Sequence, residues 1–91
     1  MEFNRVVLRK HNENDIEFMG KQVASSGNVA VYETPKGHWL CTAFDMYGNS
    51  VQHDVVENKN EKALHELLGN SDNSKKIYDQ LGLNLNNHLD L

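Results

Sequence analysis

The sequence predicts an α+β domain in which about five antiparallel strands form a meander sheet, followed by two C-terminal helices packed on one face. Turn residues recur about every ten positions over the first two-thirds of the chain, a spacing typical of short strands. The last third changes to helical spacing of its apolar residues. The chain has 91 residues, 38% of them hydrophobic and 24% charged, which suits one modest core. We therefore expect a single domain over 1–91, of which 83–91 is a C-terminal tail.

Five segments of the chain are predicted as strands. Each is separated from the next by a short run rich in Asn, Gly, Ser or Pro, residue types that favour turns. Short linkers join antiparallel neighbours, so the strands are expected to pair in chain order. The predicted strands cover 3–10, 15–24, 29–34, 38–47 and 50–57.

Two helices are predicted after the strands. Asn60 is a candidate N-cap for the first helix, and Gly69 is its stop signal. Ser71 or Ser74 caps the second helix, which ends at Gly82. One apolar face of the first helix is formed by Ala63, Leu64, Leu67 and Leu68, and the second helix carries Ile77, Tyr78 and Leu81.

The predicted strand 38–47 is apolar on both faces. A strand of this kind is usually central or covered by helices. The helices can cover one face, while the other face becomes an interface, since a large exposed apolar patch usually marks a partner. The first face presents Trp39, Cys41 and Ala43, and the second presents Leu40, Phe44 and Met46.

Cys41 and His53 lie on neighbouring predicted strands, with Asp45 or Asp54 nearby, so a Cys–His–Asp nucleophile has to be considered. The strand register decides whether these side chains share a face. A one-residue slip moves every side chain of a strand to the other face. The alternative role for Cys41 is that of a small buried hydrophobic residue.

The register follows from the turn between the two strands. A two-residue turn at 48–49 suits Gly at its first position and makes Cys41 face Val56, while His53 faces Phe44. Cys41 and His53 then point to opposite faces, which disfavours the nucleophile. This register also gathers a group of apolar residues, namely Leu40, Phe44, Met46, Val51 and Val55.

Composition disfavours several classes of function. The five His residues do not show metal-ligand spacing, and the single Cys excludes an intrachain disulfide, so we predict no metal and no cofactor. A formal net charge of −4 disfavours a nucleic-acid partner, because phosphate contacts supply most of that affinity. The sequence lacks an apolar run of roughly 20 residues that would span a membrane. With a free Cys41 and no apparent export signal, we expect a cytoplasmic location.

Two stretches, 18–21 (Phe-Met-Gly-Lys) and 31–39 (Val-Tyr-Glu-Thr-Pro-Lys-Gly-His-Trp), resemble a segment of EXLDI-type bacterial proteins. That segment reads roughly Phe-x-Gly-Arg, then Val-Tyr-x-Thr-x-x-Gly-x-aromatic. The family is named for Glu-x-Leu-Asp-Ile; here Leu89 and Asp90 match, Leu91 is a conservative replacement and Asn87 departs. The ribbon-helix-helix-like segment of many members has no counterpart before residue 18. The resemblance implies a bacterial protein but no reaction.

We expect a non-catalytic protein-interaction module rather than an enzyme, with a protein partner or a second copy of the chain as its ligand. The tail either docks on its own domain or is displayed to a partner. The interface candidates are Tyr32, Trp39, Cys41, Tyr47, Leu89, Asp90 and Leu91. The alternative is a small-ligand-binding domain or minor enzyme with a pocket between sheet and helices. The candidates for that pocket are Phe44, Met46 and His53.

Overall fold

The structure is a computed structural model that describes residues 2–83. An antiparallel sheet in chain order is followed by two helices, so the predicted fold class is confirmed. The strands are β1 (Asn4–Leu8), β2 (Ile16–Ser26), β3 (Val29–Glu33), β4 (Trp39–Phe44) and β5 (Ser50–Val56). A short 3₁₀ helix, η1 (Glu57–Lys59), leads to α1 (Glu61–Leu68) and α2 (Asp72–Leu81).

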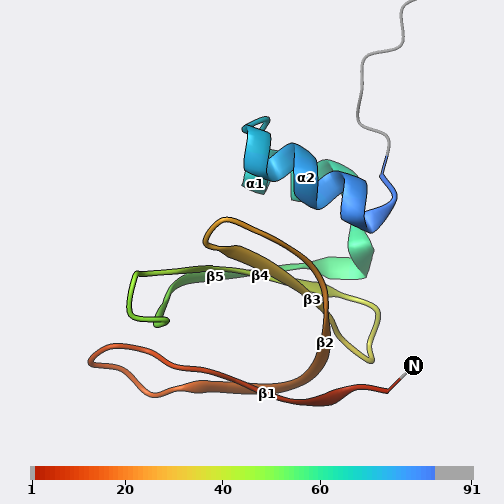
Figure 1. Cartoon of the computed structure of the whole chain (residues 1–91). Coiled ribbons are helices and arrows are strands. Elements are labelled where there is room, and N and C mark those ends of the chain that lie inside the picture. Colours follow the sequence, from red (N-terminus) through yellow and green to blue (C-terminus); the bar gives the residue numbers. More distant parts are fainter. Residues whose placement is uncertain (1, 84–91) are drawn as a thin grey trace, which may run out of the picture.

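The sheet bends so strongly that the molecule has three layers (Figure 1). The helices lie over one side of β3–β5, which we call the helix face. β1 and the start of β2 lie beneath the other side, which we call the hairpin face. β2 reaches both strand layers because it is 11 residues long, and its register shifts between Gln22 and Ala24. Such an irregularity bends a strand and increases its twist.

One hydrogen bond joins the two edges of the bent sheet. The end of β1 meets the start of β5, where Ser50 N donates to Arg9 O at 2.7 Å. Within the described residues, β1 and β5 otherwise stand at opposite ends of the strand order. The sheet is therefore partly rolled, and its hairpin face becomes concave.

The main core lies between the helix face and the two helices. Leu64 and Val31 are 0% exposed and Ile77 is 1% exposed, so both helices and the sheet contribute to it. Gln80 of α2 also holds the end of β2, because its side-chain amide bonds the backbone N and O of Ser25 at 2.9 and 2.7 Å. The buried cluster consists of Ala24, Val31, Trp39, Cys41, Val56, Leu64, Ile77 and Tyr78.

Local signals start and stop the helices where the sequence predicts. Asn60 Oδ1 accepts from Ala63 N at 3.0 Å, and Ser71 Oγ accepts from Ser74 N at 3.1 Å. These bonds satisfy backbone donors that have no partner within the helix. Of the two serines considered for the second helix, Ser71 is therefore the cap. Gly82 follows α2 with a φ of 74°, a left-handed conformation that Gly adopts easily.

The predicted register of β4 with β5 is wrong. Cys41 pairs with Asp54, not with Val56 as expected. His53 pairs with Thr42. The pairing partner of Cys41 has moved from 56 to 54, and a shift of two residues preserves the face of every side chain. Cys41 and His53 therefore still point to opposite sides of the sheet.

The turn between β4 and β5 explains the different register. The Asp45 carboxylate accepts from the backbone N–H of Tyr47 and of Asn49, both at 2.9 Å. Gly48 N donates to Asp45 O at 3.1 Å, and Gly48 has a φ of 84°. The loop is thus longer than two residues, because an Asp side chain bonds the backbone that follows it. A further register shift after Ala43 adds another residue to β5.

The apolar residues that the predicted β4–β5 register would have brought together do not form a core. Leu40 is buried, at 6% exposed, and Phe44 is partly buried. Met46 is 87% exposed, Val51 59% and Val55 55%. The reason is that the helices bury the opposite face of β4, and that β4 ends before residue 46.

Candidate functional site

The four predicted interface residues that the structure describes do not form one surface. Trp39 and Cys41 lie under the helices, 6% and 4% exposed, and belong to the main core. Tyr32 lies on the hairpin face, where its ring packs against Phe18. Tyr47 stands in the β4–β5 turn and is 81% exposed. Three predicted interface residues lie outside the described part of the chain: Leu89, Asp90 and Leu91.

The environment of Cys41 is that of a core residue. Burial, and to a lesser degree the Asp54 carboxylate paired with it, raise the pKa of the thiol to about 12. The thiol therefore stays protonated near neutral pH, and the thiolate is the form that acts as a nucleophile. His53 points to the other face of the sheet, so it is not placed to remove the proton.

A cavity of about 280 Å³ lies between the sheet and the helices. Cys41 and Asp54 line it from the sheet, and Leu67 and Ile77 line it from the helices. Within the described residues, no buried side-chain nitrogen or oxygen lacks a hydrogen-bond partner, so this cavity does not present an orphaned polar group to a ligand. The residues predicted for a pocket here do not line it: Phe44, Met46 and His53.

A turn patch, which we define as Met46 and Tyr47, is the most exposed large apolar surface along residues 2–83. Met46 is 87% and Tyr47 81% exposed. Sequence reasoning placed a two-residue turn at 48–49 and continued the strand to residue 47, so it missed that the turn begins at Asp45. The signal was Asp45 three residues before Gly48, the pattern of a type I turn. Hydrogen bonds to the Asp45 carboxylate, chiefly from Asn49 N, lower its pKa, so the turn is held by a charged acceptor.

A second cavity, which we call the apolar cleft, opens on the hairpin face and has a volume of about 430 Å³. Strands β2, β4 and β5 and the β3–β4 loop all contribute to its lining. Sequence reasoning could not find this cleft, because its walls meet only when the sheet bends. Its lining residues are Phe18, Met19, Thr34, Pro35, Lys36, His38, Leu40 and Val55.

A third cavity lies beside the end of α2, and its mixed lining includes three charged residues, Lys21, Glu33 and Lys59. Glu33 forms ion pairs with Lys59 and with Lys21, the latter at 3.5 Å. The hydrogen bond from Lys59 is the main cause that lowers the pKa of the Glu33 carboxyl. The Glu33 carboxylate of β3 thus binds one lysine from β2 and one from η1, so this cluster ties the three elements together.

The fold and its sites define an α+β domain with a partly rolled meander sheet, one exposed turn patch and one apolar cleft. Comparison with models of known families, with curated proteins and with solved structures finds no match. The resemblance to EXLDI-type proteins stays a prediction. In the part of the chain that the structure describes, no three His, Cys, Asp or Glu side chains gather as metal ligands. Neither helix between residues 2 and 83 is long and apolar enough to cross a membrane.

Proposed function

We propose that this chain is a non-catalytic protein-interaction module that contacts its partner through the turn patch. The observation that carries the proposal is the exposure of two adjacent apolar side chains, Met46 at 87% and Tyr47 at 81%. Met and Tyr are enriched at protein–protein interfaces. Moving apolar surface from water into an interface stabilises a complex by roughly 25 cal/mol per Å².

The backbone beneath the turn patch favours binding. Asp45 holds the N–H groups of Tyr47 and Asn49, so the turn keeps one shape while the side chains of the patch extend into solvent. A rigid loop loses less conformational entropy on binding than a mobile one. The partner expected from this shape has an apolar pocket that accepts the end of a β-hairpin. A second copy of the chain is one such partner.

The proposal that the chain is non-catalytic rests on the surroundings of Cys41, the candidate nucleophile. Cys41 is 4% exposed, and its thiol has a pKa of about 12. His53 is turned away from it by the register of β4 and β5. A thiol that is buried, protonated and has no histidine beside it is suited to packing rather than to attack on a substrate.

Site-specific photo-crosslinking in bacterial cells tests the proposal. The full chain carries p-benzoylphenylalanine in place of Tyr47, and a control carries it in place of exposed Lys76, which lies on α2 away from the turn. We expect a discrete crosslinked product with the probe at 47 and none at 76. A product of twice the chain mass identifies a second copy, and any other mass identifies a different partner.

The purified partner then allows a binding measurement. We expect the double variant Met46→Ser, Tyr47→Ser to weaken binding about ten-fold or more, in the range of interface hot spots. The variant should keep the unfolding midpoint of the parent chain, because both side chains are mostly in solvent. Equal crosslinking at 47 and 76, or no product at 47, would contradict the proposal.

A further inference from the structure

The apolar cleft is built from segments far apart in the sequence. Phe18 and Met19 belong to β2, Leu40 to β4 and Val55 to β5, and Pro35 stands in the β3–β4 loop. Two of its lining residues are about half exposed, Met19 at 49% and Val55 at 55%, so the cleft is open to solvent. Its volume of about 430 Å³ lies in the range of small-molecule sites, roughly 300–1,000 Å³.

One wall of the cleft is formed in advance of any ligand. The Phe18 ring meets the Tyr32 ring edge-on, with centroids 5.5 Å apart and planes at 84°, a favoured aromatic geometry. A Cβ atom on Gly20 would lie 2.7 Å from Phe18 Cε2 and 3.2 Å from Glu33 O. The missing side chain of Gly20 therefore provides the space that the Phe18 ring occupies.

The polar residue types among those that line the cleft all come from the β3–β4 loop, namely Thr34, Lys36 and His38. The loop shape is set by two backbone hydrogen bonds, each of 2.9 Å, from Thr34 N to His38 O and from Gly37 N to Thr34 O. None of the described residues lining the cleft is acidic. The surface that lines the cleft nevertheless belongs almost entirely to apolar atoms, so these residues line it with their hydrocarbon parts, and the positive charge of Lys36 lies beyond the lining.

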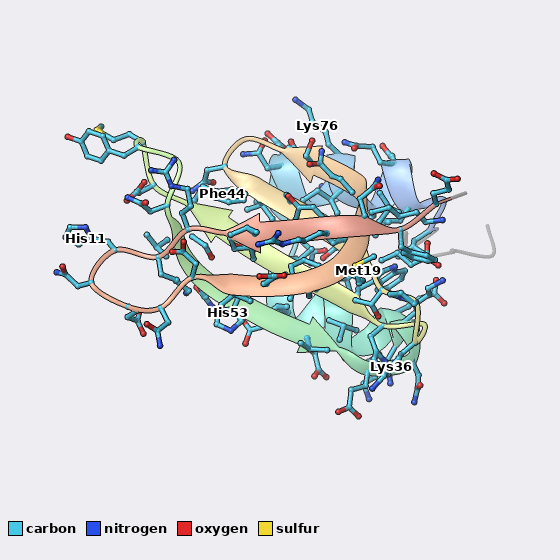
Figure 2. The ribbon with its side chains drawn as sticks, turned by 90° about the horizontal axis from the view of Figure 1, so that it is seen from below. His11, Met19, Lys36, Phe44, His53 and Lys76 are labelled. Carbon is cyan, nitrogen blue, oxygen red and sulfur yellow. The ribbon has the colours of Figure 1, made fainter. Side chains whose placement is uncertain are left out.

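The hydrogen bonds of this loop leave donors for a ligand. Asn58 N donates to His38 Nδ1 at 2.9 Å, so a neutral imidazole carries its proton on Nε2 and is a donor there. Lys36 is exposed, and within residues 2–83 it takes part in no ion pair. Met19 and Lys36 lie toward the same end of the molecule in Figure 2.

We propose that the apolar cleft binds a small carboxylate with an apolar body, of which a medium-length fatty acid is the simplest example. The hydrocarbon lies against Phe18, Leu40 and Val55, and the carboxylate extends out of the cleft toward Lys36 and His38. One ammonium group and one imidazole N–H match a singly charged head group better than a doubly charged phosphate. This binding site is separate from the turn patch and does not depend on the proposed interaction function.

An NMR titration of the ¹⁵N-labelled full chain tests the site with octanoate as the probe. We expect saturable shifts of the backbone amides of Phe18, His38, Leu40 and Val55. Acetate has the head group without the body, and 1-octanol has a body of the same length without the charge. Both are expected to bind more weakly than octanoate. Equal binding of octanol and octanoate would overturn the proposal, as would shifts confined to residues around the helix–sheet cavity.

A charge reversal locates the carboxylate. We expect Lys36→Glu to weaken octanoate binding about ten-fold at low salt, because attraction becomes repulsion at a partly solvated site. Lys76→Glu is the matched control, since Lys76 is also exposed and lies on the other side of the molecule (Figure 2). Amide shifts outside the loop should match the parent chain and so show an intact fold. Equal effects of the two substitutions, or no binding by the parent chain, would refute the assignment.

Discussion

The thiol of Cys41 lies beneath the helices, 4% exposed, with the Asp54 carboxylate as its cross-strand neighbour. Burial and the neighbouring negative charge both disfavour the thiolate, which is why the pKa rises to about 12. Tyr78 packs in the same core, and burial raises its pKa as well. At the scale of single residues, surroundings rather than residue type thus decide whether a side chain is reactive.

We predict that folded Cys41 reacts far more slowly with iodoacetamide than the same residue in urea. A rise of the pKa from 9.0 to about 12 leaves about a thousand-fold less thiolate at a mildly alkaline pH. The rate of carbamidomethylation, followed by mass spectrometry in the two states, checks this. Comparable rates in native buffer and in urea would show that the thiol is accessible and ionised.

The same shift of the pKa carries a pH dependence of stability. The unfolded chain loses the thiol proton above about pH 9.0, whereas the folded chain keeps it up to about pH 12. The stabilisation from this group is therefore complete below pH 9.0 and declines as the pH rises through that interval. Urea unfolding should show a smaller decline over this window for Cys41→Ala than for the parent chain.

At the scale of elements, the β4–β5 hairpin shows how one side chain sets a register. The Asp45 carboxylate accepts hydrogen bonds from two backbone N–H groups of its own turn. Gly48 adopts the positive φ that the turn requires. The turn then ends at Asn49, which donates to Asp45 through both backbone and side chain. Pairing along the whole of β5 follows from this loop length, because each strand residue has one cross-strand partner.

We predict that protonation of Asp45 weakens the hairpin at acid pH. Because the folded pKa is depressed, the stabilisation is present above the ordinary value of 3.8 and is lost as the pH falls through the lower folded pKa. Asp45→Asn keeps an acceptor but removes the titration, so its unfolding midpoint should depend less on pH below 3.8 than that of the parent chain. Parallel acid dependence of the two chains would contradict this role.

At the scale of the whole molecule, the two sides of the sheet have different energetic roles. Both helices pack on the helix face, and Leu64, Val31 and Ile77 in the core between them are at most 1% exposed. The hairpin face buries Leu40 but leaves Val55 half in solvent at the mouth of the apolar cleft. Stability is therefore concentrated on the helix face, while the hairpin face keeps apolar surface for a ligand.

A pair of substitutions tests this division. Ile77→Ala should lower the free energy of unfolding by about 2–4 kcal/mol, because it leaves a cavity in a packed core. Val55→Ala should lower it by less than about 1 kcal/mol, since much of the side chain already contacts water. Urea unfolding with unchanged m-values gives both numbers. A larger loss of stability for Val55→Ala than for Ile77→Ala would contradict the conclusion that the main core lies on the helix face.

Local sequence signals were sufficient to predict where the helices and strands lie in the chain. Asn60, Ser71 and Gly82 mark helix ends in the structure as they do in the sequence, because capping depends on a few adjacent backbone groups. The strands agree with their predicted segments to within a few residues for the same reason. The predicted register of β4 with β5 was wrong, although Asp45 and Gly48 indicate the longer turn. The same stretch of sequence also suits a two-residue turn at Gly48-Asn49, which gives a different register.

The arrangement of the two faces came only from folding. Nothing near Phe18 or Val55 in the sequence says that these residues line one cleft, because they meet only when β2 bends at its register shift and brings β1 beneath the sheet. The same event, together with the helices, decides that Trp39 is buried while Tyr47 is exposed. Caps and turns depend on neighbours a few positions away, whereas burial depends on every element that packs against a residue.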